Sequence, residues 1–232
     1  MTSVTSVAET HPDSSLRERK KAETRRTLRR IALGLFADRG FSQVTAEEIA
    51  DAAGVSTRTF FNYFPSKEAV LLGADPDRLQ QVRDSVLAPP AGTPALAVVH
   101  AAVLTWARQA TAQVTDLGGD PRDWLRRIKA ARADLHLRSA QAAHMDAIEH
   151  TVAVALAQRL GVDPERDPYP TLLAALASGT FRTCLAFWAD SGGTIPLDRL
   201  ADLAFQAFAD GLPETAALRH AVTGATDRKD NH

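Results

Sequence analysis

Residues 45–64, TAEEIADAAGVSTRTFFNYF, constrain the fold more than any other stretch of this 232-residue chain. Thr45 is followed three residues later by Glu48, which is the pattern of a capping box. In a capping box the two residues satisfy each other's free backbone amides at a helix start. Gly54 would end that helix, because glycine adopts the left-handed conformation without strain. The pattern predicts a short helix followed by a tight turn.

A second short helix is predicted directly after this turn. Ser56 is placed to cap it, and we expect it to run from Thr57 to Phe61 or Asn62. Its first turn carries only polar side chains, which would contribute nothing to an apolar core. Two helices joined in this way are typical of a helix-turn-helix, whose second helix offers its N-terminal residues to base edges in the DNA major groove. The stretch therefore predicts a DNA-reading unit.

The candidate DNA-binding residues lie in and beside these two helices. Arg58 has the guanidinium fork that pairs with guanine, and Thr59 could bond to a base or touch a thymine methyl group. Lys67, in the first turn of the next helix, is predicted to neutralise a phosphate. The full set is Thr45, Ser56, Thr57, Arg58, Thr59, Phe61, Asn62, Tyr63 and Lys67.

Charge is unevenly distributed, although the formal net charge is only −1. Residues 1–72 hold 11 Lys and Arg against 9 Asp and Glu, and the remainder holds 16 against 19. Within residues 16–39 a phosphate-facing stripe is one explanation for the concentration of basic side chains. A solvated helix face is the other, and it is the more ordinary one for any single arginine. The nine basic residues are Arg17, Arg19, Lys20, Lys21, Arg25, Arg26, Arg29, Arg30 and Arg39.

Three motifs follow one another across residues 24–72: FADRGF, then T-x-x-x-I-A-x-x-A-G-V-S, then T-F-F-N-Y-F-x-S-K-E-x-V-L. Together they resemble the N-terminal domain of TetR-family transcriptional regulators and cover about a fifth of the chain. The resemblance implies a homodimer, usually a repressor, that binds a short palindromic operator in double-stranded DNA. It also implies that a ligand entering the C-terminal domain releases the DNA.

The remainder of the chain shows only helical periods and no strand alternation. We expect an all-α fold, with an N-terminal three-helix helix-turn-helix domain followed by a helical bundle for ligand binding and dimerisation. Asp75 and Pro76 indicate a break, either as a kink or as a boundary between two helices. The predicted domains are a disordered arm at 1–15, the DNA-binding domain at 16–73, the bundle at 74–218 and a frayed tail at 219–232. The predicted helices of the bundle after this break are about 94–115, 121–134, 136–160, 169–190 and 196–211.

The last two helices, 169–190 and 196–211, have broad apolar faces with many small residues. Such breadth suits packing against two partners, and in TetR-like regulators these helices pair with their copies across a two-fold axis. Ordinary intrachain core is the alternative for about half of these residues.

Pocket residues are expected on the helices before the dimer face, because ligand pockets are mostly apolar with a few polar groups. Aromatic and Met residues at helical spacing are more often core, so the assignment competes with that alternative. A basic cluster around Arg127 could recognise an anionic head group, although a solvated face is the default explanation. The candidates are His100, Val103, Leu104, Trp106, Trp124, Arg127, Ile128, Met145, Ile148, Phe181 and Trp188.

Two stretches, DWLRRIKAARADLHLRSA and YPTLLAALASGTFRTCLAFWADSGG, resemble more loosely the C-terminal domains of TetR-like regulators that bind acyl-CoA-like ligands. That resemblance implies a long apolar tunnel with a basic mouth. The predicted effector is therefore a small hydrophobic or acyl-CoA-like molecule.

Enzymatic and metal chemistry find no support in the residues. The histidines show no i, i+4 pair with a carboxylate partner, and no Gly-rich phosphate loop or G-x-S-x-G occurs. Cys184 is the only cysteine, so neither an intrachain disulfide nor a cysteine metal cluster is expected. No apolar run reaches the roughly 20 residues of a membrane span. We predict a cytoplasmic protein with no metal, no cofactor, no catalytic residues and no membrane partner.

Two other functions stay open at the level of sequence. A constitutive or architectural DNA-binding dimer would need no effector pocket. An all-helical catalytic or transport-accessory protein with a vestigial DNA head would show turnover and no operator.

Overall fold

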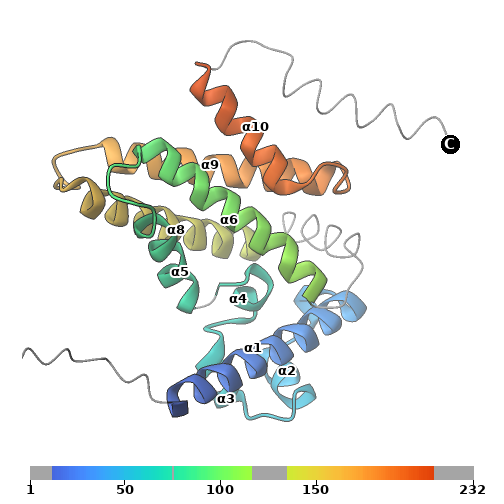
Figure 1. The fold of residues 1–232 in the computed structure, drawn as a ribbon. Coiled ribbons are helices and arrows are strands. Elements are labelled where there is room, and N and C mark those ends of the chain that lie inside the picture. Colours follow the sequence, from blue (N-terminus) through green and yellow to red (C-terminus); the bar gives the residue numbers. More distant parts are fainter. Residues whose placement is uncertain (1–11, 75, 117–134, 212–232) are drawn as a thin grey trace, which may run out of the picture. The chain divides into compact units, whose positions relative to one another are not determined.

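The computed structural model describes residues 12–74, 76–116 and 135–211, and no strand occurs among these residues. The predicted all-α class is confirmed. The chain divides between Gly73 and Ala74 into two compact units, unit 1 and unit 2. Figure 1 shows the helices of both units along the sequence.

Unit 1 consists of one long helix and several short ones. The long helix begins at Pro12, within the predicted arm at 1–15, and a proline is well tolerated in the first turn of a helix. The described elements are α1 (Pro12–Arg39), the 3-10 turn η1 (Phe41–Gln43), α2 (Ala46–Ala52), α3 (Thr57–Tyr63) and α4 (Lys67–Leu72).

The short helices of unit 1 depend on a shared core. Helices of six or seven residues are unstable alone in water, so their apolar faces must be buried against other elements. α1 packs against α2, η1 and α4, and α2 packs against α3. The side chains buried in this core are Leu28, Ala32, Leu33, Phe36, Val44, Ile49, Ala50, Phe60, Phe64, Ala69 and Val70.

The predicted break at Asp75 and Pro76 separates two helices. α4 ends at Leu72, and Gly73 follows with a φ of 64° in the left-handed region. A new helix, α5, then begins at Pro76. The break therefore marks a boundary and not a kink within one helix.

Unit 2 contains long helices whose bounds follow the predicted periods closely. The predicted helix at 121–134 and the tail at 219–232 lie outside the described residues, as do positions 1–11 of the predicted arm. The described elements are α5 (Pro76–Leu87), α6 (Ala95–Asp116), α8 (Leu135–Leu160), α9 (Tyr169–Asp190) and α10 (Leu197–Ala209).

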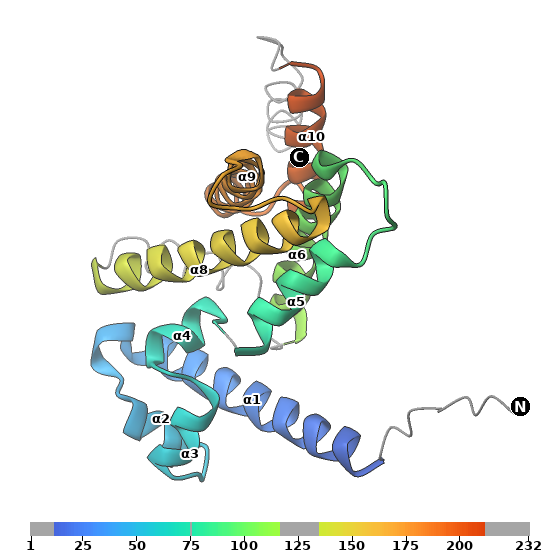
Figure 2. The same cartoon turned by 90° about the vertical axis from the view of Figure 1, so that its left-hand side faces the viewer.

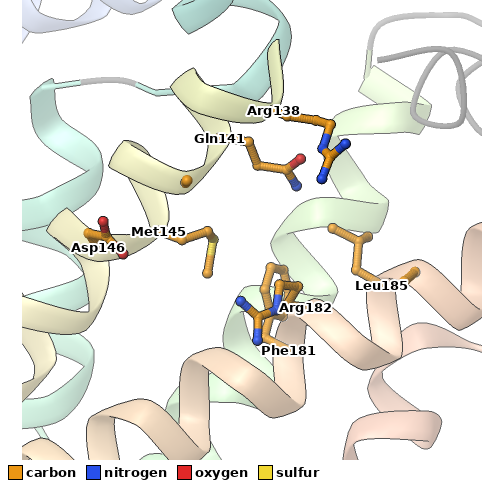
Figure 3. Close-up of a pocket in the computed structure, with 9 residues that line it drawn as sticks. Arg138, Gln141, Met145, Asp146, Phe181, Arg182 and Leu185 are labelled. Atoms are coloured by element: carbon orange, nitrogen blue, oxygen red, sulfur yellow. The ribbon is translucent and has the colours of Figure 1, made fainter. Parts of the chain in front are cut away.

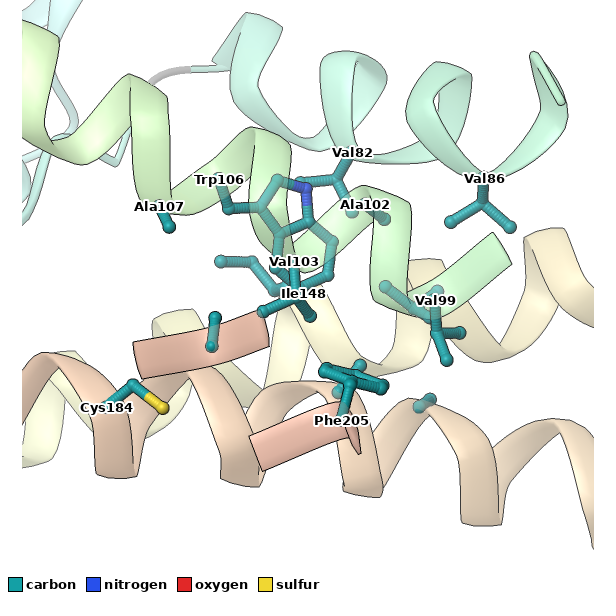
Figure 4. Close-up of a cluster of buried hydrophobic side chains, with 14 of the residues drawn as sticks. Val82, Val86, Val99, Ala102, Val103, Trp106, Ala107, Ile148, Cys184 and Phe205 are labelled. Carbon is teal, nitrogen blue, oxygen red and sulfur yellow. The ribbon is translucent and has the colours of Figure 1, made fainter. Parts of the chain in front are cut away.

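One continuous apolar core holds unit 2 together (Figure 4). α8 packs against α5 and α9, while α6 packs against α5, α9 and α10. Figure 2 shows α8 and α9 crossing within this arrangement. Trp106 of α6 lies among Val82 of α5, Ile148 of α8 and Phe205 of α10. Full burial of a Val, Ile or Phe side chain stabilises the folded state by roughly 1.5–3 kcal/mol.

α9 is the one described helix that is long and apolar enough to cross a bilayer, with a mean hydropathy of 1.4. The expectation that no such run exists was therefore too strict. However, 44% of that window is buried inside the structure. One face of α9 lies in the core of unit 2 through Leu173, Ala177, Cys184 and Trp188. A helix that is buried in a protein core can reach the same length and hydropathy as a membrane span.

Candidate DNA-binding face and ligand pocket

The start of α2 carries the predicted capping box. Thr45 Oγ1 accepts a hydrogen bond from the Glu48 amide at 3.2 Å, and the Thr45 amide donates to Glu48 Oε2 at 2.9 Å. Arg39 Nη2 also donates to Glu48 Oε1 at 2.6 Å. The Thr45 amide and then Arg39 hold the pKa of Glu48 below its ordinary value, because both favour the ionised carboxylate. Thr45 thus fixes the start of α2, where its hydroxyl oxygen acts as an acceptor, and its predicted role in DNA binding stays a prediction.

α3 is capped as predicted, and the cap also involves a residue assigned to base contact. Gly54 has a φ of 67°, and Ser56 Oγ accepts from the Thr59 amide at 3.1 Å. The hydroxyls of Ser56 and Thr59 lie 2.8 Å apart and form a second hydrogen bond. Thr59 therefore acts at the helix start, and the predicted use of its hydroxyl on a base competes with this bond.

The exposed face of α3 is narrower than the predicted set of DNA contacts. Arg58, Phe61 and Asn62 are all exposed, and their spacing of i, i+3 and i+4 places them on one side of the helix. Phe61 is 49% exposed, and its ring meets the buried Phe60 ring edge-on at 5.3 Å. These three side chains offer a guanidinium fork, an apolar ring and an amide. Those are the groups that recognise guanine, thymine methyl and adenine.

Thr57 and Tyr63 occupy the two ends of α3, and both are half-buried. They flank the exposed face and do not lie at its centre. Their predicted roles in DNA binding stay predictions.

Lys67 has partners that the sequence did not indicate. Its Nζ donates to the carbonyl oxygen of Phe41 at 3.0 Å and to that of Val44 at 2.9 Å. The same ammonium lies 4.4 Å from the centre of the Phe41 ring. The predicted phosphate contact was an inference from position in the first turn of α4. The structure instead engages two of the three ammonium hydrogens within unit 1.

The basic residues of α1 also divide into two groups. Arg39 is tied to Glu48 and to the carbonyl oxygen of Gln43 at 3.3 Å. Arg39 is itself exposed, so its pairing is what distinguishes it from Lys20, Lys21 and Arg26, which are exposed side chains earlier on α1. The second group is the better candidate for phosphate contacts.

A pocket of about 350 Å³ lies between α8 and α9 (Figure 3). Its volume is at the low end of the range for small-molecule sites. Arg138 and Arg182 supply two positive charges to its lining, and Asp146 supplies one negative charge. The rest of the lining is mostly apolar. The lining residues are Arg138, Gln141, Ala142, Met145 and Asp146 of α8 and Phe181, Arg182, Leu185 and Ala186 of α9.

Among the described residues, only Met145 and Phe181 of the predicted pocket residues line this pocket. Val103, Trp106, Ile148 and Trp188 are buried in the core of unit 2. Leu104 is half-buried and packs against that core. The burial of these five residues fits the core alternative, and their assignment to a ligand pocket stays a prediction. Trp124, Arg127 and Ile128 lie outside the described residues.

His100 joins two helices and does not line this pocket. Its Nε2 lies 3.2 Å from Asp202 Oδ1, and its ring stacks on Phe205 at 4.7 Å. Asp202 also accepts a hydrogen bond from Arg199 at 2.8 Å. His100 therefore helps to fasten α6 to α10.

The described residues contain no group of three or more His, Cys, Asp or Glu side chains placed to hold a metal ion. Burial raises the pKa of the Cys184 thiol to about 11, so the reactive thiolate is scarce near neutral pH.

Sequence reasoning missed most of the pocket lining. In α8 the lining positions 138, 141, 142, 145 and 146 follow helical spacing and mix polar with apolar residues. Such a mixed face is a usable signal, because a pure core face would be apolar throughout. The helix that supplies the other wall is more than 30 positions away in sequence, and no local pattern connects the two.

Both parts of the chain match known protein families. Residues 28–74 match the family described as bacterial regulatory proteins, tetR family, and residues 118–213 match the MftR C-terminal domain. A stretch of 57 residues is 51% identical to the HTH-type transcriptional regulator TcmR of Streptomyces glaucescens, covering 25% of each chain. Another, of 72 residues, is 36% identical to the putative mycofactocin biosynthesis transcriptional regulator MftR of Mycobacterium tuberculosis. It covers 31% of this chain and 36% of that protein, so the chain spans well under half of these curated relatives.

Solved structures of similar fold cover more of the chain. Native NalD, the secondary repressor of the MexAB-OprM multidrug efflux pump in Pseudomonas aeruginosa, matches with a TM-score of 0.52 and 19% identity, over 82% of this chain and 97% of that one. FadR of Thermus thermophilus, solved in complex with lauroyl-CoA, matches with a TM-score of 0.48 and 28% identity, over 82% and 95%. The likeness to NalD is one of fold.

Proposed function

The chain belongs to the TetR family of bacterial transcriptional regulators, and on that premise we propose that it is a ligand-responsive repressor. In this proposal it binds a palindromic operator in double-stranded DNA as a homodimer. A small hydrophobic or acyl-CoA-like effector releases it from that operator. In this proposal the protein acts in the cytoplasm, and it needs no membrane partner, no cofactor and no catalytic step.

The observation that carries the proposal is the exposed face of α3. Arg58, Phe61 and Asn62 lie on one side of a helix whose start is fixed by Ser56 and whose opposite side is anchored by the buried Phe60. Recognition requires side chains held at defined positions, and a capped and anchored helix supplies that rigidity. Arg58 is assigned to base readout, with Phe61 and Asn62 beside it.

The dimer is supported by apolar surface that one chain leaves uncovered. Leu172 of α9 is 66% exposed, and Tyr169 of the same helix is exposed as well. α9 already buries its opposite face in unit 2, so a second partner would cover this one. Pairing of residues 169–190 and 196–211 with their copies would place two α3 helices in successive major grooves, roughly 34–36 Å apart.

The pocket between α8 and α9 supports the choice of effector. Met145, Phe181 and Leu185 supply apolar lining, and the two positive charges of Arg138 and Arg182 outnumber the single negative charge of Asp146. An amphiphile with an acidic head and a hydrocarbon tail fits this chemistry, since arginine pairs with carboxylate and phosphate groups. At about 350 Å³ the pocket holds part of an acyl chain and its head group, and the remainder of a coenzyme A moiety would extend outside.

DNA selection tests the proposed recognition. Random duplexes captured by the purified protein should converge on a palindrome with two half-sites about one helical turn apart. Arg58→Ala should then weaken binding and relax base preference at one position of each half-site, at a cost of about 1–3 kcal/mol. Arg166→Ala is the matched control, because Arg166 is exposed in a loop of unit 2 beside Asp163. An equal loss of affinity for operator and random DNA would instead identify Arg58 as a phosphate contact.

Displacement from the selected duplex tests the effector. Laurate and lauroyl-CoA should lower operator occupancy, and Arg182→Ala should raise the concentration needed by about tenfold or more. Arg166→Ala, which removes an exposed arginine of a loop outside the pocket lining, should leave that concentration unchanged. A protein that stays on its operator with every amphiphile would instead be a constitutive DNA-binding dimer.

A further inference from the structure

We infer that Lys67 is a positioning residue for DNA recognition: its ammonium fastens the first turn of α4 to the segment that leads into α2, and it does not serve as a phosphate contact. This inference rests on the proposed DNA-binding function. It assigns a role that differs from the one its position in the sequence indicates.

The contacts of Lys67 all lie within unit 1 and involve segments distant in sequence. Its two acceptors, the carbonyl oxygens of Phe41 and Val44, are 26 and 23 positions away. The ring of Phe41 lies beneath the ammonium, and that ring packs on Phe36 of α1 at 5.0 Å. One side chain therefore connects α4 to the end of α1 and to the turn before α2.

The position of Lys67 is electrostatically unfavourable for a surface cation. It is the first residue of α4, where the helix dipole and the free amides favour negative charge. Two carbonyl oxygens and an aromatic face offset this repulsion, because each presents negative charge to the ammonium. Three such contacts hold a lysine at a helix N-terminus, where its charge is unfavourable, and this indicates that Lys67 has a structural role there.

The segment that Lys67 holds sets the position of the reading helices. Val44 is fully buried, and its neighbour Thr45 is the cap of α2. α2 packs directly on α3, which carries the exposed Arg58. Loosening the turn at 41–44 would therefore shift α2 and α3 relative to α4, although none of the DNA-facing side chains had been changed.

Salt dependence separates a positioning residue from a phosphate contact. Each phosphate neutralised contributes about 0.9 to the slope of log affinity against log salt concentration. We expect Lys67→Met, which keeps the aliphatic stem, to lower affinity for the selected operator by about tenfold. Its affinity for random duplex and its salt slope should stay within about twofold and 0.3 of those of the unaltered protein. Lys21→Met makes the same chemical change at a candidate phosphate contact on α1, and it should instead lower the salt slope by about 0.9 and weaken binding to operator and random duplex alike.

Two results of this experiment would overturn the inference. A slope lower by about one, with equal losses on operator and random DNA, would identify Lys67 as a phosphate contact. An unchanged operator affinity would show that the fastening has no part in recognition.

A measurement on the unaltered protein covers the case in which Lys67→Met fails to fold. Trace labelling with an amine-reactive acetyl ester, read by mass spectrometry, compares the reaction rates of individual lysines. Lys67 should react at least about fivefold more slowly than Lys20 and Lys21 in the free protein, because its ammonium is engaged. Adding the selected duplex should leave the rate at Lys67 unchanged. Equal rates in free protein, or protection only with DNA, would refute the assignment.

The two proposals can fail separately. If selection yields no preferred DNA sequence, the proposed function fails. The labelling rates in free protein still decide whether Lys67 is engaged as described.

Discussion

Units 1 and 2 are both all-helical, but their helices are held in place by different means. In unit 1 the helices α2, α3 and α4 have only six or seven residues, and each begins with a side-chain cap from Thr45, Ser56 or Ser66. In unit 2, α9 and α10 have 22 and 13 residues and begin after prolines, without a side-chain cap. Local hydrogen bonds define the short helices, whereas burial in a continuous core defines the long ones.

This difference decides where function can be located from a sequence. The proposed DNA-facing residues Arg58, Phe61 and Asn62 belong to one short helix with recognisable ends, so a local pattern finds them. The pocket of unit 2 has walls from α8 and α9, whose lining residues are adjacent only after packing. Both units are stabilised by an apolar core, but the helix bounds and the candidate recognition residues are set locally in unit 1, whereas the pocket lining of unit 2 is distributed between two helices.

Truncation of a core residue should have the largest effect, and it should appear in unit 2. Leu156 of α8 is fully buried, so Leu156→Ala should lower the free energy of unfolding by about 2–5 kcal/mol. Leu185→Ala, the same change at the pocket wall, should cost less than half as much, because Leu185 is only partly buried. Urea unfolding followed by tryptophan fluorescence measures both. Equal losses would mean that the pocket wall is part of the core.

A charge on the uncovered face of α9 should have the next largest effect. Leu172→Glu should raise the dimer dissociation constant at least about tenfold, which is about 1.4 kcal/mol. Val154→Glu is the control, because Val154 is 42% exposed on α8 and lies outside the proposed dimer face. Sedimentation velocity across a dilution series measures the dissociation constant. A dimer weakened by Val154→Glu and untouched by Leu172→Glu would relocate the interface to α8.

The same serine substitution should have opposite effects in the two units. Ser56→Ala removes the cap of α3 and should destabilise unit 1 by about 1 kcal/mol. Ser139 is exposed in α8, so Ser139→Ala should be neutral or slightly stabilising, because alanine is the better helix former. Amide hydrogen exchange within each helix measures the local opening free energy. A loss at Ser139 equal to that at Ser56 would contradict the distinction between capped and core-held helices.

The predictive value of the sequence follows the same division. The Thr45–Glu48 box and the Ser56 cap were predicted because both partners lie within three positions, and the hydrogen bonds confirm them. The helix bounds of unit 2 were also close, since periodicity reports which face is buried. Lys67 was predicted to contact a phosphate from its position alone, because the two carbonyl oxygens that accept its hydrogen bonds are more than 20 positions away in sequence.

Pocket residues were the least predictable part of the molecule. Trp106 and Trp188 were candidates because pockets are rich in aromatic residues, but cores are too, and both side chains are buried in the core. Arg138 and Arg182 were missed because a single exposed arginine carries no sign of its neighbour. Only the crossing of α8 and α9 brings these two residues to one pocket.

The smallest expected effect is a difference in acid sensitivity between the units. Burial, and then the nearby charge of Arg78, lowers the pKa of His144 in unit 2 below its ordinary value of 6.5. Below that pH the unfolded chain takes up a proton that the folded unit resists, so the unfolding free energy of unit 2 should fall as the pH drops below 6.5. In unit 1 the pKa of Glu48 is lowered by the Thr45 amide and by Arg39 from an ordinary 4.5. Its stabilising effect is present above pH 4.5 and should be lost only as the pH falls through the lower folded value.

The two pH windows can be separated because all three tryptophans, at 106, 124 and 188, belong to unit 2. Tryptophan fluorescence during urea unfolding should therefore show unit 2 weakening between about pH 7 and 5, where His144→Gln should flatten the dependence. Glu48→Gln should leave that window unchanged and should flatten only the more acidic loss of helical signal from unit 1. If Glu48→Gln altered the window near pH 6, acid sensitivity would be shared between the units. The contrast between local and distributed stabilisation would then fail for their charged groups.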